Sequence, residues 1–216
     1  MTQEQVAAKI VSICQRLNAK NYLASADGNV SYRMSDDRIL ITPAGVNKAE
    51  LAPEDLAVVK LDGTVVSGKP SSERAMHLKI YASAPHARAV VHAHPPTAIA
   101  WTIARPDLKE LPKDSMSELI LAVGRVPIAP YARPGTADMG EVLEPLLPDH
   151  RVMILARHGA LSWGEDLSEA YNGMERLEHA ALILKSAVEI GGLTALPSVE
   201  IAVLEEMRKK LGPRTL

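Results

Sequence analysis

Apolar positions along the chain switch between helical and strand spacing. From Val6 to Leu17 they recur every three or four residues behind Thr2, which predicts an amphipathic helix with Thr2 as its N-cap. Short β-rich runs follow at residues 29–33, 38–42, 56–61 and 64–67. Asp62-Gly63 joins the last two runs and predicts a hairpin, so we expect this part of the sheet to be antiparallel.

The rest of the chain interleaves helices with strands. A helical pattern begins at Ser71 and ends before Pro85, and a β-rich run at 89–94 stops at Pro95-Pro96. Further elements are predicted as helices at 97–104, at 117–123, after Ala137, at 167–190 and at 198–211, as strands at 151–156 and 160–163, and as an extended stretch at 126–134. No repeat or linker separates them. We therefore expect one three-layer α/β/α domain over residues 1–216, with helices on both faces of a mixed, largely antiparallel sheet.

Composition narrows the function classes. The chain has 216 residues, of which 47% are hydrophobic, and its formal net charge of −2 comes without a cluster of Lys or Arg, so we expect no nucleic-acid partner. No window has the length and apolarity of a membrane span, and the N-terminus lacks the apolar core of a signal peptide, so we expect no membrane partner and a cytoplasmic location. Because Cys14 is the one cysteine, any metal site must be built from histidine and carboxylate.

Two histidines share the end of one predicted strand. His92 and His94 alternate along the run that Pro95 ends, so both side chains leave the same face about 6–7 Å apart. This spacing suits two ligands of one metal ion. The pattern is short, and a purely structural or surface role for the pair is equally consistent with it.

A third histidine ends another predicted strand. His158 follows the buried run at 151–156, and Gly159 allows a sharp turn or a close approach to a ligand. Three imidazoles with one open position are the arrangement of a catalytic zinc site, whereas a structural zinc is closed by four protein ligands. The alternative is a hydrogen-bonded histidine at a strand end.

Two turns could hold an anion. Ser71 and Ser72 precede a predicted helix, where hydroxyls, free N–H groups and the helix dipole favour a phosphate. The simpler interpretation is an ordinary N-cap with Glu73 in the first turn. Gly28-Asn29 forms a second candidate, because both residues tolerate positive φ and can present N–H groups.

The other histidines are expected to be structural. His77 lies four residues after Glu73 on the same helix face, so a Glu/His metal pair is conceivable, but we favour a hydrogen-bonded structural role. His86, His150 and His179 are expected to be solvated or packed.

The chain resembles the class II sugar-phosphate aldolase and epimerase family, typified by L-fuculose-1-phosphate aldolase and L-ribulose-5-phosphate 4-epimerase. Each motif alone is unspecific, and their shared order is specific. The motifs are Gly28-Asn29-Val30-Ser31, Ile41-Thr42-Pro43-Ala44-Gly45, Gly68-Lys69-Pro70-Ser71-Ser72-Glu73, His92-Ala93-His94-Pro95, Ala129-Pro130-Tyr131 with Gly135-Thr136, and Arg157-His158-Gly159.

The resemblance implies a complete catalytic site. It implies zinc on His92, His94 and His158, and it makes Glu73 a residue that can ligate the metal and act as acid or base. Imidazole ligands favour zinc over magnesium, with cobalt or manganese as substitutes. The resemblance implies a homotetramer with active sites at subunit interfaces. It also implies a substrate phosphate held by the following residues: Gly28, Asn29, Gly45, Ser71 and Ser72.

The sequence departs from the family pattern in three places. Aldolases of this type carry a Tyr about a dozen residues before the Ala-Pro-Tyr segment, where this chain has Ser115-Met116-Ser117-Glu118. Glu118 is then a candidate for the missing proton donor to the aldehyde. Ala44 replaces the usual Thr or Ser, which removes a hydroxyl from the phosphate pocket, and the C-terminal end carries no aromatic residue.

These features favour an aldolase that cleaves a ketose 1-phosphate, such as a fuculose or deoxypentulose phosphate, into dihydroxyacetone phosphate and an aldehyde. Zinc would act as a Lewis acid, and Glu73 would move the proton at the reacting carbon. Glu73 favours the aldolase branch because the epimerases carry Asp there. The alternatives are a decarboxylase, a 4-epimerase or a dehydratase of a related sugar phosphate, and a more remote one is a non-enzymatic domain like the adducin head.

Overall fold

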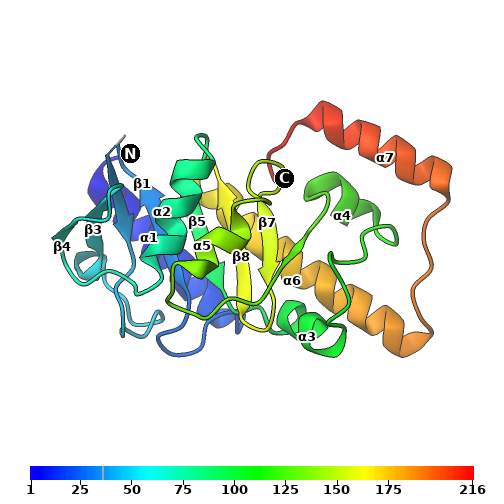
Figure 1. Cartoon of the computed structure of the whole chain (residues 1–216), viewed down its shortest axis with the longest axis horizontal. Helices are drawn as coiled ribbons and strands as arrows, with labels where there is room; N and C mark the ends of the chain where they lie inside the picture. The colour runs from blue at the N-terminus through cyan, green and yellow to red at the C-terminus, as the bar shows by residue number, and fades with distance from the viewer. Residues whose placement is uncertain (36) are drawn as a thin grey trace.

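The structure, a computed structural model, describes residues 1–35 and 37–216 and has a central sheet between two layers of helices (Figure 1). The helices are α1 (Gln3–Ala19), α2 (Arg74–Ser83), α3 (Pro96–Ala104), α4 (Ser117–Ala122), α5 (Asp138–Leu143), α6 (Leu167–Ile190) and α7 (Ser198–Leu211), with a 3-10 turn η1 (Pro53–Asp55). The strands are β1 (Asn29–Arg33), β2 (Arg38–Ile41), β3 (Ala57–Lys60), β4 (Val65–Ser67), β5 (Ala89–Ala93), β6 (Ile128–Ala129), β7 (Val152–Leu155) and β8 (Gly159–Gly164).

The eight strands form one sheet in the order β4-β3-β2-β1-β5-β8-β7-β6. β6 pairs with β7 in parallel, and the other neighbours pair antiparallel. The predicted α/β class and the mixed, largely antiparallel sheet are confirmed. The two strands that deliver the three histidines, β5 and β8, are hydrogen-bonded neighbours in the middle of the sheet.

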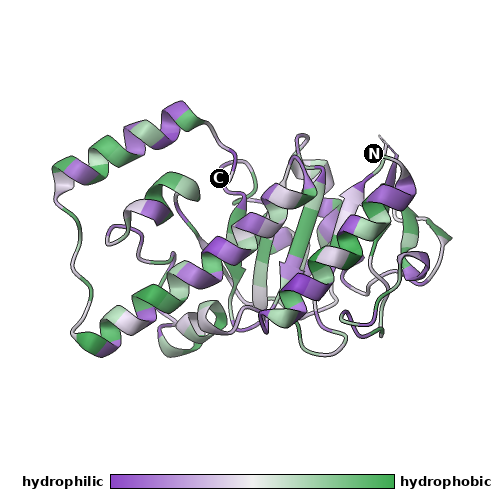
Figure 2. Ribbon diagram, turned by 180° about the vertical axis from the view of Figure 1, so that it is seen from behind, coloured by the Kyte–Doolittle hydropathy of each residue, from purple (hydrophilic) through white to green (hydrophobic). Residues whose placement is uncertain are grey.

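The sheet buries both faces because alternate side chains point to opposite sides. Val91 packs in the core under α1 and α6, the helices that cross this face in Figure 2. Val90, the residue before it, packs in the second core with Ile80 of α2 and Met139 of α5. His92 has the parity of Val90, so its side chain leaves the sheet on the α2 side. This alternation puts the histidine next to the start of α2.

Local sequence signals explain most element boundaries. Thr2 and Gln5 form a reciprocal capping box at the start of α1, as the pattern predicts. The β3–β4 hairpin closes through a hydrogen bond from the Lys60 N–H to the Thr64 carbonyl at 2.8 Å, with Gly63 at a φ of 91°. α6 and α7 have the predicted bounds.

The helix expected from Ser71 begins at Arg74 instead. The Ser71 hydroxyl accepts the Glu73 N–H at 3.2 Å and holds a turn ahead of the helix. The extended stretch at 126–134 contributes only the two residues of β6 to the sheet.

A buried carboxylate anchors the C-terminal segment. Glu169 of α6 pairs with Arg151 at 2.7 Å and with Arg214 at 3.0 Å, and it also accepts the backbone N–H groups of Glu165 and Thr215. Four donors compensate its burial. In the described part of the chain, none of the helices has the length and apolarity to cross a membrane.

Candidate active site

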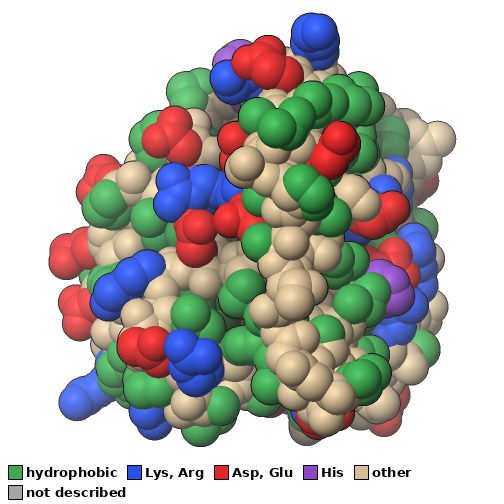
Figure 3. Space-filling view, turned by 90° about the vertical axis from the view of Figure 1, so that its right-hand side faces the viewer, with side chains coloured by type: hydrophobic (Ala, Val, Ile, Leu, Met, Phe, Trp, Pro, Cys, Tyr) green, Lys and Arg blue, Asp and Glu red, His purple; other side chains and the backbone are tan. Residues whose placement is uncertain are grey.

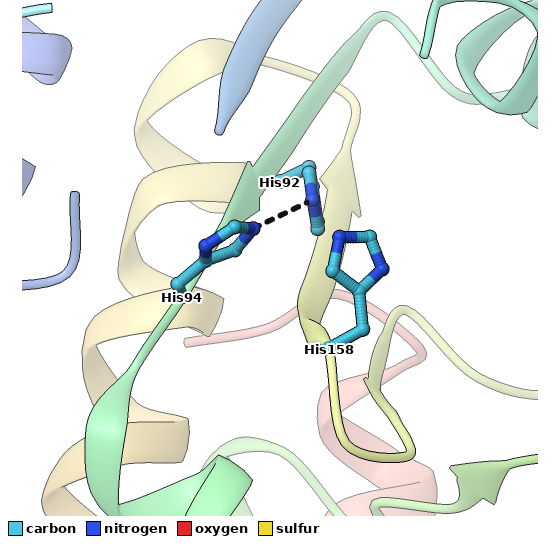
Figure 4. Close-up of side chains that lie close together, drawn as sticks. All are labelled: His92, His94 and His158. Carbon is cyan, nitrogen blue, oxygen red and sulfur yellow. Dashed lines mark hydrogen bonds between the residues drawn. The ribbon is translucent and has the colours of Figure 1, made fainter. Parts of the chain in front are cut away.

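The structure brings His92, His94 and His158 together, as Figure 4 shows. His92 is the residue before the last in β5, His94 directly follows the strand, and His158 projects from the tight turn between β7 and β8. Arg157 in that turn has a φ of 60°, and its N–H donates to the Thr102 hydroxyl at 2.9 Å. The turn therefore fixes where His158 points.

The spacing of the imidazoles matches a shared metal ion. The ring centroids lie 4.9–5.1 Å apart, and one nitrogen from each ring falls within 4.8 Å of the others. Nε2 of His94 lies 3.3 Å from Nε2 of His92. Two nitrogens bound to zinc at about 2.0–2.1 Å and at a tetrahedral angle would lie about 3.3–3.4 Å apart. This pair already has that separation.

A hydrogen bond orients one of the rings, and a carboxylate contact orients a second. Nδ1 of His92 donates to the Ala160 carbonyl at 2.9 Å, so its Nε2 carries the lone pair that faces the cluster. Nδ1 of His94 lies 3.4 Å from the Asp27 carboxylate, which favours the same tautomer there. Such outer partners are the usual support of metal-bound histidines.

Glu73, just ahead of α2, reaches into the cluster. Its Oε2 lies 3.3 Å from Nε2 of His92, and its Oε1 lies 3.3 Å from Nε2 of His158. Asn29 donates to Oε2 at 2.8 Å. The carboxylate thus sits where it could be a fourth ligand or could exchange a proton with a bound substrate.

The electrostatics favour the charge states that metal binding requires. Burial, reinforced by the charge of His92, lowers the pKa of His94 and lowers the pKa of His158 to about 4, so both are neutral at pH 7. Burial opposes ionisation of Glu73, but its contact with His92 and the hydrogen bond from the Asn29 amide outweigh burial and lower the pKa of this carboxyl. Neutral imidazoles and an ionised carboxylate are a donor set that suits Zn²⁺, Co²⁺ or Mn²⁺.

The residues predicted to hold phosphate lie in three loops, except Asn29, which is the first residue of β1. The N–H of Ser71 donates to the Thr42 carbonyl, and the N–H of Ala44 donates to the Lys69 carbonyl, so the loops that carry Gly45 and Ser72 are joined. Ser71 is buried, whereas Ser72 is exposed.

Gly28 belongs to the third loop and lies against the end of β5. A Cβ at Gly28, whose φ is 67°, would lie 2.7 Å from the carbonyl oxygen of His92. The three loops and the histidines therefore border one another. Phosphate binding by Gly28, Asn29, Gly45, Ser71 and Ser72 stays a prediction.

Sequence reasoning missed two residues near these loops. Asp27 reads only as part of a turn, yet it contacts His94. Lys48 is fully buried, and its Nζ donates to the carbonyls of Ala26 and Val46 at 2.9 and 2.8 Å, which ties two of the loops together. A single lysine in a polar stretch carries no sequence signal for such a role.

The remaining candidates do not belong to the histidine cluster itself. His77 is fully buried and hydrogen-bonded, the structural role that its helix position favours. His86 and His150 line a cavity of about 740 Å³ between α4, α7 and β8, together with Trp163. Trp163 lies three residues along β8 from Ala160, about 10 Å away. Glu118 is exposed on α4 and accepts from Ser117, so its proton-donor role stays a prediction.

Comparison with known proteins agrees with this arrangement. Residues 8–184 match the family model for the Class II Aldolase and Adducin N-terminal domain. A 3-oxo-tetronate 4-phosphate decarboxylase from Pectobacterium atrosepticum is 34% identical over 185 residues, 85% of each chain. An L-fuculose phosphate aldolase from Methanococcus vannielii is 35% identical over 173 residues, 80% of this chain and 92% of that one.

A solved structure supports the same assignment. YgbL from Klebsiella pneumoniae, described as a candidate aldolase/epimerase/decarboxylase, superimposes with a TM-score of 0.87 at 31% identity, covering 94% of this chain and 99% of that one. The family match spans most of the chain, and the fold agrees with it. The chain therefore belongs to the Class II Aldolase and Adducin N-terminal domain family, as one of its enzymes.

Proposed function

We propose that this enzyme cleaves a carbon–carbon bond next to the carbonyl group of a phosphorylated sugar acid or sugar, with a divalent metal ion held by His92, His94 and His158. The observation that carries this proposal is the position of Glu73, whose two carboxylate oxygens lie 3.3 Å from His92 and from His158. A proton-transfer group thus stands at the edge of the metal-binding cluster.

Bound zinc supplies a Lewis acid that stabilises negative charge on a carbonyl oxygen. The residues of this chain hold the ion and the phosphate. His92 and His94 keep their nitrogens free for the ion through the Ala160 and Asp27 contacts. The joined loops of Gly28, Gly45 and Ser72 present N–H and hydroxyl donors for the phosphate, which fixes the substrate relative to Glu73.

Glu73 moves the proton at the reacting carbon. The bond to the leaving group breaks, and its electron pair forms the enediolate of a triose phosphate. A carboxyl group of Glu73 that has taken a proton from solvent then delivers it to that carbon. In the reverse direction the ionised carboxylate, the form that its surroundings favour, removes the same proton.

We propose carbon dioxide as the leaving group, so that the substrate is a 3-oxo sugar-acid phosphate. Loss of an aldehyde requires a base that takes the proton of the substrate hydroxyl, and Ser115-Met116-Ser117-Glu118 carries no Tyr for this step. Loss of carbon dioxide from a carboxylate requires no such group. The similarity to the Pectobacterium decarboxylase supports this choice.

Aldol cleavage of a ketose 1-phosphate is the second candidate, supported by the similarity to the Methanococcus aldolase, which covers a slightly shorter part of this chain. By their chemistry, 3-oxo-tetronate 4-phosphate and fuculose 1-phosphate both yield dihydroxyacetone phosphate. The second product therefore separates the two functions, since it is carbon dioxide in one case and an aldehyde in the other.

The test offers the zinc-loaded protein each substrate and measures both second products, with Glu73→Gln as the matched variant. We expect carbon dioxide from the sugar-acid phosphate. Aldehyde release from the ketose phosphate alone would assign the aldolase instead. An unfragmented epimer would assign a 4-epimerase and a dehydrated product a dehydratase, and no turnover of any of these substrates would refute the proposal.

A partial reaction tests Glu73 whatever the leaving group is. Dihydroxyacetone phosphate incubated with the enzyme in deuterated water should exchange one carbon-bound hydrogen, because Glu73 removes and returns it. Glu73→Gln should abolish the exchange. Equal exchange by both proteins would contradict the role of Glu73.

We also propose a homo-oligomer, a tetramer as the family resemblance implies. Figure 3 shows hydrophobic side chains on the end of the molecule that faces the viewer. Exposed hydrophobic side chains of α3, α6 and α7 include Ile103, Val188, Ile190, Val199 and Val203. Such exposed groups favour an interface between subunits. Light scattering should give four chains per particle, and a monomer at assay concentration would contradict this. The cytoplasmic location stays a prediction.

A further inference from the structure

A chain of buried polar side chains runs from Glu73 into the interface between α2 and β1. Asn29 contacts both Glu73 and Nε2 of His77, Nδ1 of His77 contacts the Ser31 hydroxyl at 2.7 Å, and Ser31 contacts the Tyr81 hydroxyl at 2.7 Å. All four residues beyond Glu73 are at most 2% exposed. These side chains are therefore shielded from bulk solvent.

The direction of the hydrogen bonds follows from the chemistry of each group. A carboxylate can only accept, so Asn29 must turn its NH₂ group toward Glu73. The amide oxygen of Asn29 then faces His77 and can only accept, so Nε2 of His77 must carry the hydrogen. Flipping the Asn29 amide would set two acceptors against each other at the Glu73 end and two donors against each other at the His77 end.

The directions of the remaining hydrogen bonds follow from the same reasoning. Burial, with the charge of His92, lowers the pKa of His77 to about 3, so its ring is neutral and carries one hydrogen. Because Nε2 holds it, Nδ1 accepts from the Ser31 hydroxyl. Ser31 has then used its one hydrogen and accepts from Tyr81. Every donor therefore points toward Glu73.

We infer that His77, held by Ser31 and Tyr81, is a positioning residue for the proton transfer, because it locks the Asn29 amide in the one orientation that donates to Glu73. This inference rests on the function proposed for Glu73. The Asn29 bond holds Oε2, which leaves Oε1 the freer oxygen to exchange a proton with substrate. Loss of the lock would let the carboxylate turn away without removing any of the three histidines.

The first test compares His77→Gln with His77→Leu. Gln can still donate to Asn29, whereas Leu has a similar size and no donor. We expect His77→Leu to lower kcat by about tenfold to a hundredfold, the effect of one buried hydrogen bond to a charged group, while KM for the phosphorylated substrate and bound zinc stay unchanged. His77→Gln should restore most of kcat. Equal kcat for the two variants would overturn the inference.

A second pair of variants distinguishes a role in the hydrogen-bond chain from a role in packing alone. Ser31→Ala removes the donor to His77, and Ser162→Ala removes an equally buried strand hydroxyl that has no hydrogen-bond partner among the described residues. Ser31→Ala should lower kcat by about threefold to tenfold, whereas Ser162→Ala should leave it unchanged. Equal effects would mean that Ser31 only packs.

Nitrogen NMR of the His77 side chain gives a readout that does not depend on activity. In the full chain, with and without zinc, the ring should carry its hydrogen on Nε2 and not on Nδ1. A hydrogen on Nδ1 would refute the inferred direction of the hydrogen bonds between Tyr81 and Glu73. If the enzyme turned over none of the tested substrates, the proposed function would fail while this measurement still decided whether the lock exists.

Discussion

Gly159 is the position where the smallest substitution should disturb the metal centre most. A Cβ at this residue would lie 2.8 Å from Cε1 of His92, 2.9 Å from Cδ2 of His94 and 2.7 Å from the carbonyl oxygen of Ala93. Gly159 begins β8, directly beside the end of β5. In Gly159→Ala the new methyl group would therefore push against two of the three proposed ligands.

The required displacement can be worked out from these distances. Carbon atoms in contact normally lie about 3.5 Å or more apart, so the two rings must move by about 0.7 Å, or β8 must move away from β5. The first movement exceeds the tolerance of about 0.2 Å on metal–ligand distances. We expect zinc affinity to fall by about 10- to 100-fold and the free energy of unfolding to fall by about 1–3 kcal/mol.

Gly191→Ala is the matched control, because a Cβ there meets no atom within 4 Å and its φ of 175° is open to any residue. Zinc affinity by competition with a chelator and unfolding by urea would be measured for both variants and the wild type. Wild-type zinc affinity in a folded Gly159→Ala protein would refute the reasoning, because the ligand geometry would then not depend on this close approach.

Three further predictions concern other parts of the molecule. Glu73→Gln should keep wild-type zinc content and lose about 10²- to 10⁴-fold in kcat; an active variant would exclude Glu73 as the proton-transfer group. The unfolded chain protonates His77 below about pH 6.5 and the folded protein only near pH 3, so stability falls as pH falls through this window. Between pH 7.5 and 5.0 in chelator, the wild type should lose about 2 kcal/mol more unfolding free energy than His77→Gln, and an equal loss would show that His77 is not held neutral. Glu169→Ala removes one of the two carboxylates paired with the buried Arg151 and leaves Glu165 as its partner, so it should cost about 1–3 kcal/mol in a urea titration, whereas a loss below about 1 kcal/mol would match a surface ion pair instead.

Elements with a strong local signal could be predicted from the sequence. The capping box at Thr2, the Asp62-Gly63 hairpin and the bounds of α6 depend on residues that lie close together in the chain. The alternation of His92 and His94 on one strand is also local. Their meeting with His158 is a possibility that the strand-end positions offer and that the order of motifs shared with a family supports. It is not a local property, because β5 and β8 are far apart in the sequence and adjacent in the sheet.

The contacts that tune the site could not be predicted. Asn29 meets Glu73 because β1 pairs with β5 and α2 packs over both, and 44 residues separate the two side chains. Lys48 lies between a loop that precedes β1 and a loop that follows β2. These loops approach each other because β1 and β2 are paired in the sheet. The start of α2 at Arg74 could not be predicted either. The Ser71 hydroxyl accepts a hydrogen bond from the Glu73 N–H and holds a turn where the pattern of residues predicts a helix.

Zinc binding by the three histidines is the central claim, and metal content per chain tests it most directly. The protein would be purified without chelator and analysed beside His158→Ala and beside His179→Ala, an exposed histidine of α6 that serves as the control. We predict one zinc ion per chain in the wild type and in His179→Ala, and a strongly reduced content in His158→Ala. No bound divalent ion in the wild type, or an undiminished content in His158→Ala, would contradict the account.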